Sequence, residues 1–197
     1  MTRELILASS SPRRKMLLEM AGISFTPITS HVNEDTDKTK PADIVAELSA
    51  RKAQSVFLPH PDTIVLGADT MVALGDRIFG KPGTEEEAFE MLCALRDNTH
   101  RVYTGCSFVY ADKDGVVQMT THVEETDVIV GEATDEQLRA YIASGEAMDK
   151  AGAYGVQGLF CAYVKSIRGD YFNVVGLPVY YVKHELDRIR ASLAGGD

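Results

Sequence analysis

Residues 63–75 read TIVLGADTMVALG, and this run constrains the fold more than any other part of the sequence. Apolar and β-branched residues lie on both sides of its Gly-Ala-Asp-Thr core, which is typical of a strand buried on both faces. The run therefore predicts a buried strand inside a β-sheet, and the other predicted elements must be fitted around it.

The segments before this strand alternate between strand and helix patterns. The expected order is a strand at 5–9, a helix at 12–21, a strand at 24–29, a polar loop at 31–40 and a helix at 41–57. The first helix has clear limits, because Ser11 can cap it, Pro12 suits its first turn and Gly22 can terminate it.

The segments after the buried strand break this alternation. The expected order is a helix from 84 to about 98, a hairpin of strands at 101–110 and 116–130, a helix from 134, a glycine-rich stretch at 149–158, strands at 160–167 and 171–175, and a helix from 178. Capping boxes are predicted for the pairs Thr84 with Glu87 and Thr134 with Gln137. The whole pattern predicts one α/β or α+β domain over residues 1–197, built on a mixed sheet flanked by helices.

Charge and hydropathy narrow the classes of partner. The chain has 20 Lys and Arg against 29 Asp and Glu, a formal net charge of -9, which argues against a nucleic-acid polymer or an anionic membrane as main partner. No signal-peptide core and no run of eighteen apolar residues is present, so we expect a cytoplasmic protein. A small anion in a local basic pocket remains compatible with this composition.

The stretch SSSPRRK at residues 9–15 concentrates positive charge after the first predicted strand. If Ser11 caps the helix, Arg13 and Arg14 lie in its first turn, where the helix dipole disfavours cations. A bound anion would offset this cost, so one interpretation is a phosphate site of backbone N–H groups, serine hydroxyls such as that of Ser9, and arginines. The other is that the arginines point into solvent and the serines form a turn.

Asp69 interrupts the buried strand with a carboxylate. Burying this group without a partner would cost several kcal/mol, so it needs a metal, a cation or an opening to solvent. A hydrogen-bonded turn after Gly67 is the alternative. Glu34, in the polar loop, offers a second carboxylate, and two such ligands suit Mg²⁺ bound together with substrate phosphates.

The run GDRIFGK at residues 75–81 has the spacing of a phosphate-binding P-loop but does not fit one. Pro82 stands where a Ser or Thr hydroxyl should reach Mg²⁺, and proline lacks the backbone N–H. Ile78 and Phe79 fit a short hairpin arm better. We keep Lys81 as a candidate cation for one phosphate.

Four motifs in order, LILASSSPRRKMLLEMAG, GADTMV, GKP and DKAGAYGVQG, resemble those of the Maf family of nucleoside triphosphate pyrophosphatases. The resemblance extends from Leu5 to about Leu186 and includes VVGLP at 174–178. It implies a two-lobed α/β fold related to the inosine triphosphatase group, with an elongated mixed sheet and a cleft between lobes. It also implies metal-dependent hydrolysis of a nucleoside triphosphate to the monophosphate and pyrophosphate.

The resemblance assigns roles to the polar residues singled out above. Asp69 matches the catalytic aspartate of the family, as proton acceptor or metal ligand, and Glu34 is the second candidate ligand for Mg²⁺ or Mn²⁺. The expected phosphate-binding residues are Ser9, Arg14, Lys52 and Lys81.

Three positions that distinguish subgroups of the family are occupied here by Arg13, Thr70 and Gln157. This set resembles the subgroup that acts on dTTP and UTP, with 5-modified pyrimidine nucleotides as further candidate substrates. The amide of Gln157 can donate and accept hydrogen bonds, as the edge of uracil or thymine requires. It could instead pair with neighbouring backbone.

Two other functions stay open at this point. A purine triphosphate such as 7-methyl-GTP or an inosine-type nucleotide would keep the chemistry and change the base. A nucleotide-binding inhibitor of septum formation would need no turnover. A homodimer is compatible with such folds.

Overall fold

The buried run of the sequence forms β3, Ile64–Leu74, and its first six residues are all buried. We describe the fold from a computed structural model, which covers residues 3–195. The strand belongs to a seven-stranded sheet in the order β2-β1-β3-β5-β6-β7, with β4 paired to β3. The predicted mixed α/β class is therefore confirmed.

The remaining strands give the sheet its mixed character. They are β1 Leu5–Leu7, β2 Thr26–Pro27, β4 Arg77–Phe79, β5 Thr99–Ala111, β6 Val117–Val130 and β7 Val164–Arg168. β1 is parallel to both β2 and β3, whereas β4 is antiparallel to β3 and β7 is antiparallel to β6. The β3–β4 pairing confirms that Ile78 and Phe79 form a hairpin arm.

The chain divides into two compact units. The first comprises the chain up to Asp69, Thr104–Glu124 and the chain from Gly176 onward, and the second comprises Thr70–Tyr103 and Glu125–Val175. No helix within residues 3–195 is long and apolar enough to cross a membrane.

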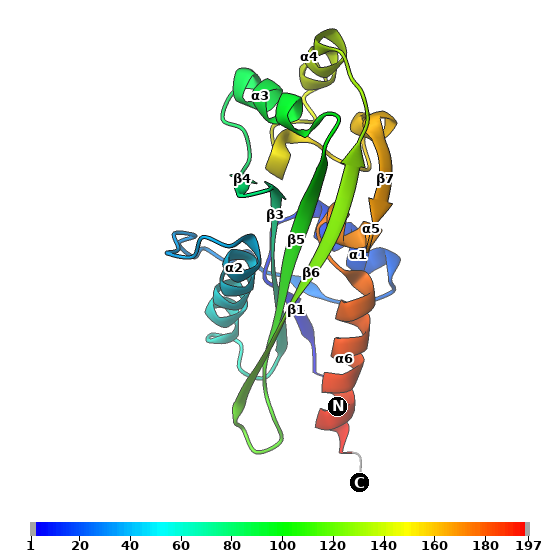
Figure 1. Cartoon of the computed structure of the whole chain (residues 1–197). Coiled ribbons are helices and arrows are strands. Elements are labelled where there is room, and N and C mark those ends of the chain that lie inside the picture. Colours follow the sequence, from blue (N-terminus) through cyan, green and yellow to red (C-terminus); the bar gives the residue numbers. More distant parts are fainter. Residues whose placement is uncertain (1–2, 196–197) are drawn as a thin grey trace. The chain divides into compact units, whose positions relative to one another are not determined.

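The first unit contains α1 Pro12–Met20, α2 Pro41–Phe57 and α6 Val179–Ala194. Figure 1 shows α2 and α6 on opposite sides of the strands of this unit. One core cluster joins α2 to β1, β3 and β5 through Ile6, Ala8, Ala53, Val56, Phe57, Val65 and Val109. The predicted limits of α2 are confirmed, since its apolar stripe faces this core.

The backbone of helix α2 lies so close to β3 and β5 that no side chain fits at positions 67 and 105. A Cβ atom on Gly67 of β3 would lie 2.2 Å from the carbonyl oxygen of Ser49, and one on Gly105 of β5 would lie 2.1 Å from that of Val45. Two glycines on two strands therefore set the depth at which α2 packs.

The second unit is built around α3 Glu85–Leu95 and α4 Asp135–Ala143, which contact each other. The capping box of Thr134 and Gln137 is confirmed. The box predicted for Thr84 is only half formed: its hydroxyl accepts the Glu87 N–H, but the Glu87 carboxylate accepts the N–H of Gly83.

Two predicted strands of the second unit are wrong in whole or in part. The segment predicted as a strand at 160–167 begins with the 3₁₀ helix η2, Leu159–Tyr163, and only its later part forms β7. Residues 171–175 form a short helix, α5, although YFNVV has a composition typical of strands.

Local capping explains the helical turn of α5. The Asp170 carboxylate accepts the Phe172 N–H at 2.7 Å, as an N-cap side chain does. The buried Asn173 amide donates to the Val102 carbonyl and to the Thr126 hydroxyl. These tertiary bonds hold the buried side chain of Asn173, and with the Asp170 cap they favour the helix observed here over the strand that the composition suggests.

A histidine is buried in the second unit beside a tyrosine. His100 is 1% exposed, and its Nε2 lies 2.7 Å from the Tyr154 hydroxyl. Burial lowers the pKa of His100 from 6.5 to about 4, against a smaller opposing effect of the Asp127 charge. The imidazole is therefore neutral at physiological pH.

We expect Gly67→Ala to lower the free energy of unfolding by about 1–3 kcal/mol, because the new methyl group forces α2 away from β3. Gly80→Ala is the matched control, since a Cβ there meets no atom within 4 Å. Urea unfolding measures both variants. Equal stability of the two proteins would contradict the close packing of α2.

We expect His100 to make stability depend on pH. Its pKa is lower folded than unfolded, so its contribution is complete above pH 6.5, is lost as the pH falls toward 4 and then stays constant. The loss amounts to at most about 3 kcal/mol. Unfolding of the wild type and His100→Gln at pH 7.5 and 4.5 tests this, and the wild type should lose more stability; parallel losses would refute it.

Candidate active site

The buried carboxylate of Asp69 is neutralised by a lysine. Lys52 of α2 places its Nζ 2.6 Å from Asp69 Oδ1, and each side chain is 11% exposed. Asp69 lies inside β3, so the alternative of a turn aspartate is wrong. The depth of α2 set by Gly67 is what brings the Lys52 ammonium to the strand.

Glu34 reaches the same ammonium group. Its Oε1 lies 2.7 Å from Lys52 Nζ, and its side chain is 60% exposed. The loop that carries Glu34 is held by the preceding residue of α2, because Arg51 Nη1 donates to the carbonyls of Asn33 and Asp35 at 2.6 and 2.8 Å. Two neighbouring residues of α2 thus have different tasks. Arg51 holds the loop of Glu34, and Lys52 pairs with the carboxylates of Glu34 and Asp69.

The serine and arginine of the SSSPRRK stretch form a second group in the first unit. Arg14 Nη1 donates to the Ser9 hydroxyl at 3.1 Å, and its Nε donates to the Gly176 carbonyl at 2.9 Å. The Ser11 hydroxyl caps α1 by accepting the Arg14 N–H, and the Ser11 N–H donates to Ser9 Oγ. The first turn of α1 therefore gathers a guanidinium, hydroxyls and backbone N–H groups, the donors that an anion site uses.

The two groups interact electrostatically. Burial lowers the pKa of the Arg14 guanidinium, while the charges of Asp69 and Glu34 raise it and that of Arg13, its neighbour in the first turn of α1, lowers it. Arg14 and Lys52 thus offset a local concentration of negative charge. The carboxylates of Asp69 and Glu34 and the cations of Lys52 and Arg14 form one electrostatic cluster on the first unit.

The other predicted residues belong to the second unit. Thr70 follows Asp69 in β3, Lys81 is exposed after β4, and Gln157 is exposed in the glycine-rich stretch. The Gly152 N–H donates to the Gly80 carbonyl at 3.0 Å, which ties the glycine-rich stretch to the residue before Lys81.

Glu34 and Asp69 are the residues that could hold a metal. Within residues 3–195, no three His, Cys, Asp or Glu side chains gather closely enough to bind an ion without further ligands. Two carboxylates that converge on one nitrogen present hard oxygen ligands to a single point. This donor set could complete a metal site only with oxygens from a substrate or water.

Sequence reasoning missed the residues that position the cluster. Gly67 could have been found, since an isolated glycine in a strand signals close approach of another backbone. The carbonyl of Gly176 and the loop contacts of Arg51 leave no local signal in the sequence.

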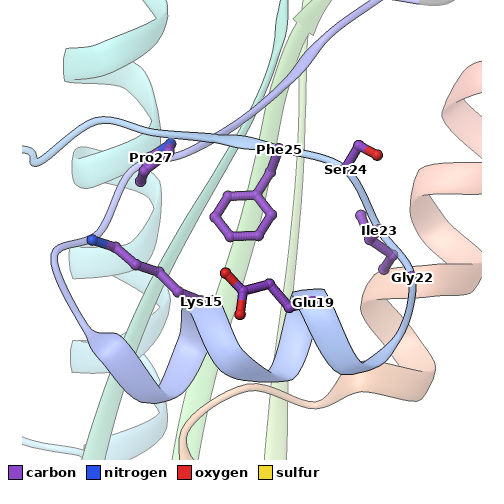
Figure 2. A pocket seen from close by; sticks show the side chains of 7 residues that line it. All are labelled: Lys15, Glu19, Gly22, Ile23, Ser24, Phe25 and Pro27. Atoms are coloured by element: carbon purple, nitrogen blue, oxygen red, sulfur yellow. The ribbon is translucent and has the colours of Figure 1, made fainter.

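A separate hollow lies beside α1, and Figure 2 shows Lys15, Glu19 and Phe25 among the residues that line it. None of the predicted site residues lines this hollow. We therefore place the candidate site at the Lys52 cluster and not at this hollow.

We expect Lys52→Met to cost about 3–5 kcal/mol of folding stability, because it leaves the Asp69 carboxylate buried without its cation. Asp69→Asn in the same chain should restore part of that loss. Lys183→Met is the control, since Lys183 pairs with Asp187 on the surface of α6 and should cost at most about 1 kcal/mol. Additive effects of the Lys52 and Asp69 changes would disprove the pairing.

Comparison with known proteins places the chain in a family. The profile of the Maf-like protein family matches residues 4–189. A dTTP/UTP pyrophosphatase of Geobacillus sp. (strain WCH70) is 47% identical over 188 residues, which cover 95% of this chain and 98% of the relative. A dTTP/UTP pyrophosphatase of Bacillus cereus is 49% identical over 185 residues, covering 93% of this chain and 94% of the relative.

A solved structure, the nucleoside-triphosphatase / dITP/XTP pyrophosphatase of Mycobacterium abscessus, is 14% identical with a TM-score of 0.37 and covers 64% of this chain and 72% of its own. That likeness is too low to bear on the fold or the activity. The family profile and the relatives named above each cover more than nine-tenths of the chain. They point to the same family as the four sequence motifs. The protein therefore belongs to the Maf family.

Proposed function

We propose that this protein is a nucleoside triphosphate pyrophosphatase that hydrolyses dTTP and UTP to the monophosphate and pyrophosphate with the help of a divalent cation. The observation that carries the proposal is the Lys52 ammonium held between the carboxylates of Asp69 and Glu34. The relatives named dTTP/UTP pyrophosphatase support the reaction and the base.

The donor set fits Mg²⁺ or Mn²⁺. Glu34 and Asp69 would hold the cation, and Mg²⁺ commonly binds through one or two carboxylates together with substrate phosphates and water. When bound, the cation neutralises charge on the phosphates. The same two carboxylates already hold a cation of another kind, the ammonium of Lys52, so they concentrate negative charge at one point.

The chain's own residues supply the remaining requirements of the reaction. Arg14, with Ser9 and the first turn of α1, binds phosphate oxygens. Lys52 adds a compact positive charge on a flexible stem. Lys52 contacts Oδ1 of Asp69. We assign Asp69 one of two roles: its Oδ2 orients the attacking water and accepts a proton from it, or the carboxylate binds the cation, since a metal-bound carboxylate is a poor base. Lys81 contributes a further phosphate contact.

Base selection falls to Arg13, Thr70 and Gln157. Gln157 is exposed and available to a ligand. Its amide can donate to a carbonyl such as O4 and accept from N3–H of uracil or thymine. A site that hydrogen-bonds a base discriminates strongly against bases that cannot match it.

The proposal predicts pyrophosphate release from dTTP and UTP in the presence of Mg²⁺, measured across a panel of nucleoside triphosphates. Asp69→Asn should lower kcat by about a hundredfold or more, because it removes the carboxylate that serves as proton acceptor or as metal ligand. Asp76→Asn is the matched control, since Asp76 is exposed in the turn after the same strand. Chelation of the metal should abolish turnover in the wild type.

Other products would redirect the proposal. A preference for 7-methyl-GTP or inosine-type nucleotides would refute the base assignment and keep the reaction. Release of single phosphate, or no turnover of any triphosphate, would refute the reaction itself. An Asp69→Asn protein that binds nucleotide and still inhibits septum formation would favour the regulatory function.

A further inference from the structure

The glycine-rich stretch contains a tight turn that presents Gln157. The Gly158 N–H donates to the Gly155 carbonyl at 3.2 Å, which closes a β-turn over residues 155–158. Val156 is 8% exposed, whereas the next residue, Gln157, is exposed. Of the two central residues of the turn, Val156 is therefore buried and anchors it, whereas Gln157 is exposed and can meet a ligand.

Glu146, which lies shortly after α4, holds the far end of this turn. Its Oε2 accepts the Leu159 N–H at 2.9 Å. A Cβ atom on Gly158 would lie only 1.9 Å from the same oxygen. The carboxylate therefore packs directly on the turn backbone, in a space that exists because residue 158 is glycine.

The near end of the turn is held by the same segment of chain. The aliphatic stem of Lys150 lies against Gly155, where a Cβ would come within 2.6 Å of its Cε. Lys150 Nζ donates to the Glu146 carbonyl at 2.5 Å, and the Tyr141 hydroxyl accepts the Gly155 N–H at 3.2 Å. Residues 141–150 therefore fix both ends of the turn.

We propose that Glu146 is a positioning residue for pyrimidine recognition: its carboxylate holds the 155–158 turn so that the Gln157 amide meets the base in one orientation. This inference rests on the base-reading role proposed for Gln157. A planar amide reads a base edge only when its direction is fixed, since loss of orientation costs binding free energy. The proposal assigns Glu146 no contact with the nucleotide.

The first test compares Glu146→Ala with Glu146→Gln. The alanine variant loses the acceptor for Leu159 N–H, and we expect its KM for dTTP and UTP to rise about tenfold with kcat within about twofold. The glutamine variant keeps a carbonyl oxygen at that place and should retain wild-type KM. Glu90→Ala, on the exposed face of α3, is the matched control and should change neither constant.

Two further measurements separate positioning from general destabilisation. Amide exchange at Leu159 should accelerate in Glu146→Ala, while amides of the α4 core keep their protection. Gly158→Ala places a methyl group where the carboxylate lies, so it should reproduce the KM defect and can replace Glu146→Ala if that protein does not fold. Gln157→Ala should abolish any further effect of Glu146→Ala, because the turn would then present no amide.

The outcomes distinguish this inference from the proposed function. If Gln157→Ala raises KM for pyrimidine nucleotides and neither Glu146→Ala nor Gly158→Ala does, the positioning role is overturned and the proposed function stands. If Gln157→Ala leaves KM unchanged while pyrophosphate is still released, the base-reading role fails and this inference fails with it. A Glu146→Gln variant as defective as Glu146→Ala would also overturn it.

Discussion

The structure of the candidate site depends on the close packing of α2 against β3 and β5. Gly67 and Gly105 allow the backbone of α2 to lie where any side chain would collide with it. At this depth Lys52 reaches a carboxylate inside the sheet, and Arg51 reaches the loop that carries Glu34. A side chain added at either glycine would have to displace the helix backbone, because protein interiors are close-packed and leave no free space for it. The placement of Lys52, and of the loop that carries Glu34, therefore depends on these two glycines.

The site places two carboxylates close together in a chain that is already acidic. An acidic chain keeps a buried aspartate beside a second carboxylate, and it offsets them with Lys52 and with Arg14. Burying these charges costs desolvation free energy, which their mutual attraction only partly offsets. Removing one partner destabilises the fold more strongly, because it leaves a buried charge without a counter-ion. This gathering of both signs of charge is the observation on which the proposed phosphate chemistry rests.

Sequence patterns predicted the elements whose signals are local. The limits of α2, the cap at Ser11 and the hairpin after β3 are confirmed, since periodicity, capping and turn residues act over a few positions. Residues 171–175 were misassigned because the bonds of Asn173 to Val102 and Thr126, distant in sequence, outweigh strand propensity. In the candidate site, Asp69 was identifiable because a carboxylate in an apolar strand is anomalous, whereas the contact of Arg14 with Gly176 spans 162 positions.

The sequence by itself determined that a carboxylate is buried in a central strand, that cations gather at the first turn of α1, and that the chain carries the motifs of its family. Only the tertiary structure decided that Lys52 pairs with both Asp69 and Glu34, that Arg14 is held by Ser9 and Gly176, and that Glu146 packs on the turn of Gln157. Local sequence patterns indicate which residues are unusual, because a carboxylate in an apolar run or cations in the first turn of a helix depart from the pattern of their neighbours. They do not record which partners meet, because those contacts join elements that only packing of the whole chain brings together.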